Sequence, residues 1–352
     1  MITNIPITNF ATSARLNRTI QTNVIAINSK KRIFDKLINI DRYFDSDDVI
    51  IINDSAVIPG SFYGIHVPSK ELIELRLVRY LSQDKNNYTL WEAIAYGEGN
   101  WLTPTEQRLD PPVIQPGDVI IIQDLSAEVK YTSLNSGRLL TIEFKVDNNE
   151  LLSKIYKYGN LIQYSYLQEE LNLWDHQTLF SSIPVSIEPS SSLFQLNWNL
   201  IDRLQGKGIE IIPITHAISI SNTGIPEIDK KLPFPERYWL SEHSAKRLNK
   251  AHKEHKHFIA FGTSVCRSLE SIIQNNGYFI PGSAEADLVL DKNYSLTITG
   301  GILTGMHMIN ESHINLLQSF LSLDRILESY SQGVDKGFLW HEYGDSMLIK
   351  NF

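Results

Sequence analysis

The pattern of apolar and polar positions divides the chain into stretches for which different secondary structure is expected. Residues 48–54 are the first clear strand, and they are apolar on both faces, as in a buried strand of a layered α/β domain. From about 57 to 150, short β-rich runs alternate with turns and show no clear helix. The pattern predicts an α/β main domain formed by 1–56 and 151–352, with a small antiparallel β-barrel or sandwich inserted at 57–150.

The individual elements follow from periodicity and from turn residues. In the inserted segment, strands are expected at 71–78, 88–96, 118–122 and 139–146. In the main domain, helices are expected at 149–158, 196–205, 241–256 and 312–330, and strands at 48–54, 209–214, 257–261 and 295–299. Because strands and helices alternate, the main sheet is expected to be at least partly parallel.

The stretch 257–270 combines an apolar strand, a tight polar loop at Gly262 and the start of a helix. Such a junction leaves backbone N–H groups free at a helix N-terminus, where an anion or a polar ligand edge can bind. Its small residues would let a ligand approach the backbone closely. The alternative is an ordinary strand–helix turn with a Ser or Thr cap.

Polar residues cluster at four expected strand ends or loops, and such ends tend to gather at one edge of an α/β sheet, where ligands bind. A carboxylate there suits a ribose diol, Arg267 suits a carboxylate or phosphate, and His307 could transfer protons near neutral pH. A turn with Asx hydrogen bonds at Asn53 and a structural role for His307 are the alternatives. The clusters are Asn53-Asp54-Ser55, Gly262-Thr263-Ser264 with Arg267, Thr304 with His307, and Tyr343-Gly344-Asp345.

Composition and charge narrow the class of protein. With 352 residues, 42% hydrophobic and 20% charged, the chain is typical of a soluble protein of about two domains. A net charge of −8 argues against a protein that is basic all over, although a local basic patch is compatible with it. The single cysteine, Cys266, excludes an intramolecular disulfide and fits a reducing cytoplasm. We expect no signal peptide and no membrane span.

The most basic window is 236–257, around the expected helix 241–256. It holds six Lys or Arg residues against three Glu, and four histidines at 243, 252, 255 and 257. One interpretation is a solvated helix face, and the other is a face that contacts phosphates of a nucleic acid. Because no carboxylate or thiolate set completes a ligand shell around the histidines, the sequence predicts no metal site.

Taken together, five segments resemble the S-adenosylmethionine:tRNA ribosyltransferase-isomerases of the queuosine pathway, and their order and spacing match along nearly the whole chain. The resemblance implies an α/β domain with an inserted β-barrel. It also implies transfer of the ribosyl group of S-adenosylmethionine to 7-aminomethyl-7-deazaguanine in tRNA, with rearrangement of the ribose, loss of adenine and methionine, and no metal. The five segments are 48–59, 236–238, 261–270, Thr304 with His307, and 343–349.

The resemblance also implies roles for single residues. His307 and Asp345 are the candidate catalytic residues, and S-adenosylmethionine is the expected substrate, with tRNA as a partner through helix 241–256. The candidate substrate-binding residues are Asn53, Asp54, Ser55, Glu236, Tyr238, Gly262, Thr263, Ser264, Arg267, Glu270, Thr304, Tyr343 and Gly344.

The chain departs from the family pattern at several of the same places. Ala56 and Ser61 stand where the family has arginines, and the segments 189–195 and 217–223 lack family glycines. Loss of glycines reshapes a pocket, and loss of arginines removes cations that hold phosphate or carboxylate. Two other functions therefore stay open: a reaction of S-adenosylmethionine with a small-molecule acceptor in specialised metabolism, and a non-enzymatic binding protein with a decayed site.

Overall fold

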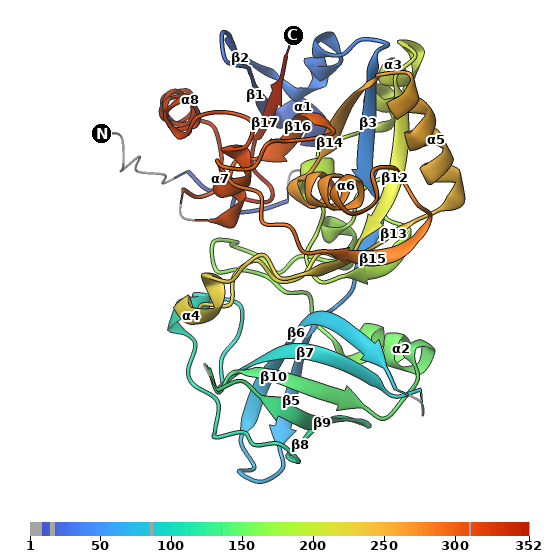
Figure 1. The fold of residues 1–352 in the computed structure, drawn as a ribbon. Helices are drawn as coiled ribbons and strands as arrows, with labels where there is room; N and C mark the ends of the chain where they lie inside the picture. Colours follow the sequence, from blue (N-terminus) through green and yellow to red (C-terminus); the bar gives the residue numbers. More distant parts are fainter. Residues whose placement is uncertain (1–8, 15–17, 85–86, 135, 310, 352) are drawn as a thin grey trace.

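A computed structural model describes residues 9–14, 18–84, 87–134, 136–309 and 311–351 (Figure 1). Its largest element is a nine-stranded mixed sheet. The central strands β12, β3, β14 and β16 are parallel to one another, while antiparallel strands flank them. The strand order is β15 (Gly282–Ala286), β13 (Glu236–Leu240), β12 (Glu210–His216), β3 (Asp48–Asn53), β14 (His257–Phe261), β16 (Thr299–Gly305), β17 (Ser346–Lys350), β1 (Asn23–Ile27) and β2 (Arg32–Lys36).

Helices cover both faces of this sheet. On β3, Ile50 and Ile52 pack with helix α3 (Trp198–Gly206), whereas Val49 and Ile51 belong to the core on the opposite face. That opposite face is covered by α5 (Glu242–Lys253), α6 (Thr263–Asn276), α7 (Ser312–Leu317) and α8 (Leu323–Asp335). Both faces of β3 are therefore buried, which accounts for its unbroken apolar run.

The inserted segment forms a closed six-stranded antiparallel barrel below the main sheet in Figure 1. Its alternating strands point one set of side chains into a core that includes Phe62, Leu75 and Ile142. The sequence predicts four of these strands, and the structure adds β5 and β9. In spatial order they are β10 (Leu139–Phe144), β7 (Thr89–Tyr96), β6 (Leu72–Gln83), β5 (Ser61–His66), β8 (Val119–Ile122) and β9 (Leu125–Thr132).

The barrel core extends into the main part of the molecule. Ile187, Ile220 and Ile225 belong to the same buried cluster as the barrel residues. Helix α2 (Asn148–Tyr158) joins it through Leu151 and Ile155. The loop segments that carry Ile187 and Ile220 are thus held between the barrel and the sheet.

Two expectations about single elements are wrong. The expected helix 312–330 is two helices, α7 and α8, because the chain turns after Leu317 and Ser322 adopts an extended backbone before α8. Both helices still bury Ile314, Leu317 and Ile326 in one core, so the apolar stripe survives the turn. Residues 295–298 are not a strand, since the backbone N–H groups of 297–299 donate to the carboxylate of Glu270.

The remaining elements are short. A two-stranded parallel pair joins the parts of the chain on either side of the barrel, and no helix among the described residues is long and apolar enough to cross a membrane. These elements are β4 (Ser55–Val57), β11 (Ile183–Ser186), α1 (Arg18–Gln21) and α4 (Pro226–Asp229).

Candidate active site

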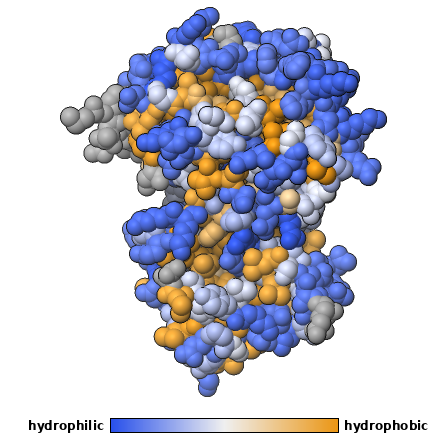
Figure 2. Space-filling model, viewed as in Figure 1, coloured by the Kyte–Doolittle hydropathy of each residue, from blue (hydrophilic) through white to orange (hydrophobic). Residues whose placement is uncertain are grey.

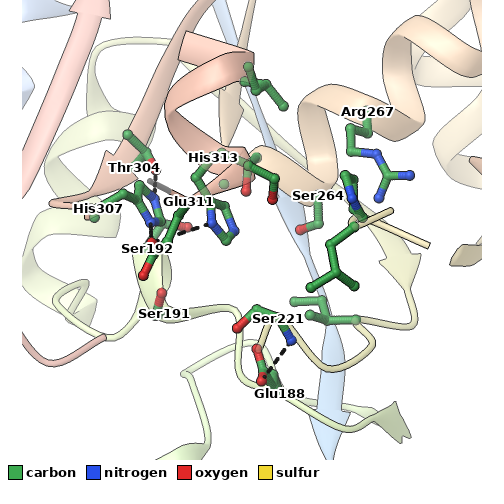
Figure 3. A pocket seen from close by; sticks show the side chains of 18 of the residues that line it. Glu188, Ser191, Ser192, Ser221, Ser264, Arg267, Thr304, His307, Glu311 and His313 are labelled. Atoms are coloured by element: carbon green, nitrogen blue, oxygen red, sulfur yellow. Dashed lines mark hydrogen bonds and ion pairs between the residues drawn. The ribbon is translucent and has the colours of Figure 1, made fainter. Parts of the chain in front are cut away.

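A cavity lies where the carboxyl ends of β14 and β16 meet the N-terminus of α6 (Figure 3). The segments 188–192 and 218–221 form the facing wall, and residues from 304 to 316 together with 341–342 close one side. Ligands of open α/β sheets bind at this kind of edge. The cavity is therefore the candidate active site.

The cavity gathers only part of the predicted site. Its lining includes Glu236, Gly262, Thr263, Ser264, Arg267, Thr304 and His307. The other predicted residues do not belong to the lining that the structure describes, and these are Asn53, Asp54, Ser55, Tyr238, Glu270, Tyr343, Gly344 and Asp345.

The start of α6 is shaped for close approach. Gly262 has φ +111°, a conformation that residues with a side chain rarely adopt, and a Cβ there would lie 3.0 Å from Ser192 Oγ. The buried hydroxyls of Ser190 and Ser192 have no hydrogen-bond partner among the described residues. Two polar atoms without partners thus stand beside the free N–H groups of a helix N-terminus.

Behind this wall lies a buried ion-pair network centred on Glu236. Its carboxylate lies 2.8 Å from His216 Nε2, accepts from Ser219 N and Oγ, and pairs with Arg267 Nη1. Burial raises the pKa of Glu236, but His216 and Arg267 outweigh it and hold that pKa at about 2. The carboxylate is therefore ionised throughout the neutral range.

Most hydrogen-bond donors of the Arg267 guanidinium are bonded within the protein. Besides Glu236, its guanidinium donates to the backbone carbonyls of Leu288, Phe234 and Ala286. Its side chain is 4% exposed, which leaves little room for a bidentate contact with a ligand. We infer that Arg267 positions the cavity wall, whereas the sequence predicts a ligand contact for it.

Two predicted site residues accept hydrogen bonds from backbone N–H groups of other segments. Asn53 Oδ1 accepts from the backbone N–H groups of Ser55 and His216, which matches the Asx-turn alternative. Asp345 accepts from the backbone N–H and the side chain of Asn23 and from the N–H of Leu339. Their acceptor atoms hold strand ends together and do not face the cavity.

The remaining residues outside the lining are also engaged. Ser55 shares a hydrogen bond with Ser186, and Asp54 accepts from Thr215, while burial raises the pKa of Asp54. Tyr343 lies 3.1 Å from His176 Nδ1 through its hydroxyl. Others are Tyr238, buried in β13; Glu270, bonded to 297–299; and Gly344, whose Cβ would lie 2.4 Å from the carbonyl oxygen of Leu339.

His307 belongs to a cluster that the sequence does not predict. Its Nε2 lies 2.8 Å from Thr304 Oγ1, and its ring stacks on that of His313 with centroids 4.1 Å apart. Both rings face the carboxylate of Glu311 (Figure 3). Burial, and then the charge of His313, lowers the pKa of His307 to about 4, so His307 is neutral at pH 7.

Two carboxyl groups, those of buried Glu188 and of half-buried Glu342, also line the cavity. Burial, and then the negative charge of Glu188, raises the pKa of Glu342 to about 8. Burial likewise raises the pKa of Glu188, which accepts hydrogen bonds from the hydroxyl of Tyr164 and the N–H of Ser221. Glu342 therefore holds a proton at neutral pH and can donate it to a ligand.

The segments where the chain departs from the family pattern lie in this wall. Ser190–Ser192 and Ile218–Ser221 line the cavity, so several lining serines come from the altered stretches. Ser61 lies elsewhere, where its hydroxyl donates to Glu74 in the barrel. The alternation of Ile218 to Ser221 could have indicated two serines on one face, whereas nothing local marks Glu311 or His313 as site residues.

Helix α5, the expected basic docking face, packs on β12 away from α7 (Figure 1). Its residues do not belong to the cavity lining as described. Lys246, Lys250 and Lys253 are exposed, and Figure 2 shows a largely hydrophilic surface along the side where Figure 1 places α5.

Comparisons with known proteins assign the chain to a class. The family model described as queuosine biosynthesis protein matches residues 5–349, and the chain belongs to this family. The chain is 26% identical over 306 residues to the S-adenosylmethionine:tRNA ribosyltransferase-isomerase of Thermus thermophilus, covering 86% of this chain and 84% of the relative. It is 23% identical over 332 residues to the protein of that name from Natranaerobius thermophilus, covering 93% and 92%.

A solved structure shows the same fold. The crystal structure of S-adenosylmethionine tRNA ribosyltransferase from Thermotoga maritima matches with a TM-score of 0.53 and 17% identity, and covers 98% of each chain. This likeness confirms the predicted fold class, and the family match confirms the resemblance seen in the sequence.

The Glu236 network generates a prediction for stability against pH. The pKa of Glu236 is about 2 in the fold against 4.5 for a free carboxyl, so ionised Glu236 stabilises the fold above pH 4.5, and this contribution is lost as pH falls toward 2. We expect Glu236→Gln to lower the free energy of unfolding at pH 7 by about 3–5 kcal/mol, because it breaks a buried pair.

Urea unfolding across a pH series measures this effect. The difference between the native protein and the variant should shrink on acidification below pH 4.5. Glu227→Gln, at an exposed position in the first turn of α4, is the matched control and should change stability little. A difference that stays constant down to pH 2 would show that the charge of Glu236 does not stabilise the fold.

Proposed function

We propose that this protein is an S-adenosylmethionine-dependent tRNA ribosyltransferase-isomerase. In this reaction the ribosyl group of S-adenosylmethionine moves to 7-aminomethyl-7-deazaguanine in tRNA and is rearranged, while adenine and methionine leave. The names of the relatives and the match to the family over nearly the whole chain support the proposal.

The polar wall of the cavity is the observation that supports placing the reaction in this cavity. Ser190 and Ser192 present buried hydroxyls without partners beside the N-terminus of α6, where Thr263 and Ser264 begin the helix. A nucleoside with a carboxylate and a ribose diol offers the hydrogen-bonding groups that such a wall lacks. We propose that S-adenosylmethionine binds here.

Departure of adenine calls for a proton donor, because a neutral base leaves more readily than an anionic one. Glu342 lines the cavity and is protonated at neutral pH, so we assign it this role. Asp345, a predicted catalytic residue, then acts through position, since it fixes the turn that carries Glu342 by accepting from Leu339 N.

The direct test is incubation of the purified protein with S-adenosylmethionine and tRNA that carries the precursor base. We expect nucleoside mass spectrometry to find the ribosyl-modified base, and chromatography to find adenine and methionine in equal amounts. Omission of tRNA is the control. Release of adenine and methionine without tRNA would instead favour a reaction with another acceptor, and no turnover in any mixture would contradict the proposal.

The unpartnered serines generate a prediction that separates stability from binding. We expect the double variant Ser190→Ala, Ser192→Ala to fold with unchanged or increased stability, because it removes buried hydroxyls that have no partner. We expect its affinity for S-adenosylmethionine to fall by about tenfold or more, since two hydrogen bonds of roughly 1 kcal/mol each are lost.

Isothermal titration and thermal unfolding measure the two quantities. Ser271→Ala is the matched control, because Ser271 Oγ is also buried without a partner but lies on α6 outside the cavity lining. This control should bind S-adenosylmethionine like the native protein. Equal affinity of the double variant would place the ligand elsewhere.

For tRNA, we propose α5 as a contact surface through Lys246, Lys250 and Lys253. Charge reversal at Lys250 and Lys253 to Glu should weaken tRNA association and flatten its dependence on salt, because phosphate contacts release counterions. Filter binding at several salt concentrations checks this. The single reversals Lys250→Glu and Lys292→Glu, the latter exposed and outside α5, change the net charge equally and are the matched pair, and equal loss in both would mean that only net charge matters.

A further inference from the structure

Three side chains beside the cavity converge on one point. His307 Nδ1 lies 3.5 Å and His313 Nδ1 lies 3.7 Å from the same oxygen of Glu311, Oε2. One ring nitrogen from each histidine and one carboxylate oxygen of Glu311 all lie within 4.8 Å of one another. His341 approaches the other carboxylate oxygen, with Nε2 3.6 Å from Oε1. Figure 3 marks the contacts of Glu311 with His307 and with His313.

The spacing of these atoms suits a metal ion better than hydrogen bonds. Separations of 3.5 and 3.7 Å between nitrogen and oxygen are too long for a good hydrogen bond. Around a tetrahedral Zn²⁺ with bonds of about 2.0–2.1 Å, neighbouring ligand atoms lie about 3.3–3.5 Å apart. The two nitrogen–oxygen separations are therefore close to ligand spacing, and rotation of the two stacked rings would bring both nitrogens and the oxygen onto a single ion.

The hydrogen bonding around the cluster prepares the same geometry. Thr304 Oγ1 lies 2.8 Å from His307 Nε2, and when Nε2 donates this bond, the lone pair of Nδ1 points toward Glu311. His313 Nδ1 is buried and has no hydrogen-bond partner in the described part of the chain. One orienting contact and one unused ligand atom thus face the same point.

The negative charge of the Glu311 carboxylate also has no Lys or Arg partner among the described residues. Among the described residues, no Lys or Arg lies within 4 Å of the Glu311 carboxylate, whose ion-pair partners are the three histidines. The contrast is the cluster of Asp45, Asp48 and His257, where the ammonium of Lys350 lies 2.8 Å from Asp48 Oδ2 and already supplies a cation.

We propose that His307, Glu311 and His313 form a binding site for a divalent transition-metal ion of the Zn²⁺ type. Two imidazoles and one carboxylate are a ligand set that Zn²⁺ accepts, and three protein ligands leave a fourth position open. All three residues line the cavity, which places the ion beside the proposed S-adenosylmethionine site. Their side chains are 15–29% exposed, which gives an ion access from solvent.

Ion binding has two structural consequences. The rings of His307 and His313 must turn apart, because their stacked centroids at 4.1 Å are closer than the rings of two ligands of a tetrahedral ion. His307 would then have no free lone pair for proton transfer, which leaves Glu342 as the proton carrier of the cavity. The sequence predicts no metal, on the histidines of 236–257 and on the family resemblance, so this site departs from that prediction.

The test measures Zn²⁺ alone, without S-adenosylmethionine or tRNA, so its outcome does not depend on the proposed function. The full chain without an affinity tag is dialysed against chelator and titrated with Zn²⁺ in competition with a chromophoric chelator. We expect one equivalent to bind. His313→Ala and Glu311→Gln should each weaken binding at least tenfold, and Thr304→Val about tenfold through loss of the orienting contact.

Controls keep the result interpretable. His257→Ala, in the cluster already neutralised by Lys350, should bind Zn²⁺ like the native protein. Circular dichroism confirms that each variant is folded, and Co²⁺ substitution gives a visible spectrum that His313→Ala should alter. The proposal is overturned if the native protein takes up no stoichiometric Zn²⁺, if His313→Ala and Glu311→Gln bind unchanged, or if His257→Ala abolishes binding.

Discussion

The buried carboxylate of Glu236 is the constraint on which the cavity depends. A charge taken fully out of water must be met by opposite charge and hydrogen bonds, and here His216, Ser219 and Arg267 supply them. These partners come from β12, from the loop after it and from α6. One carboxylate therefore fixes three segments relative to one another, and the remaining donors of Arg267 bind carbonyls that extend the same frame.

The cavity wall differs from this fully hydrogen-bonded network, because several of its polar atoms have no hydrogen-bond partner among the described residues. Ser190 Oγ, Ser192 Oγ and His313 Nδ1 are buried without partners among the described residues, although folded proteins pair nearly all such atoms. Each costs stability in the protein as it stands, and under our two proposals each gains a partner when S-adenosylmethionine or a metal ion binds. A rigid frame beside unpaired hydrogen-bonding groups is what a preorganised binding site requires.

There is a physical reason why only some of the predicted site residues line the cavity. The rule that polar residues gather at the carboxyl edge of a parallel sheet leads to Thr263, Ser264 and Thr304, which line the cavity. This rule does not distinguish a side chain that faces a ligand from one that accepts a hydrogen bond from a backbone N–H group. Asn53 ends β3 and Asp345 directly precedes the antiparallel strand β17 at the same edge of the sheet, yet the oxygens of both accept hydrogen bonds from backbone N–H groups.

The sequence by itself determined the layered sheet and the barrel, because local periodicity decides which faces are buried, and it located the junction at Gly262. Only the tertiary structure placed Ser192 against that glycine, broke the helix expected at 312–330 and brought His313 beside His307. These contacts depend on how distant segments pack and on the direction of each side chain. Periodicity along the chain carries information on neither.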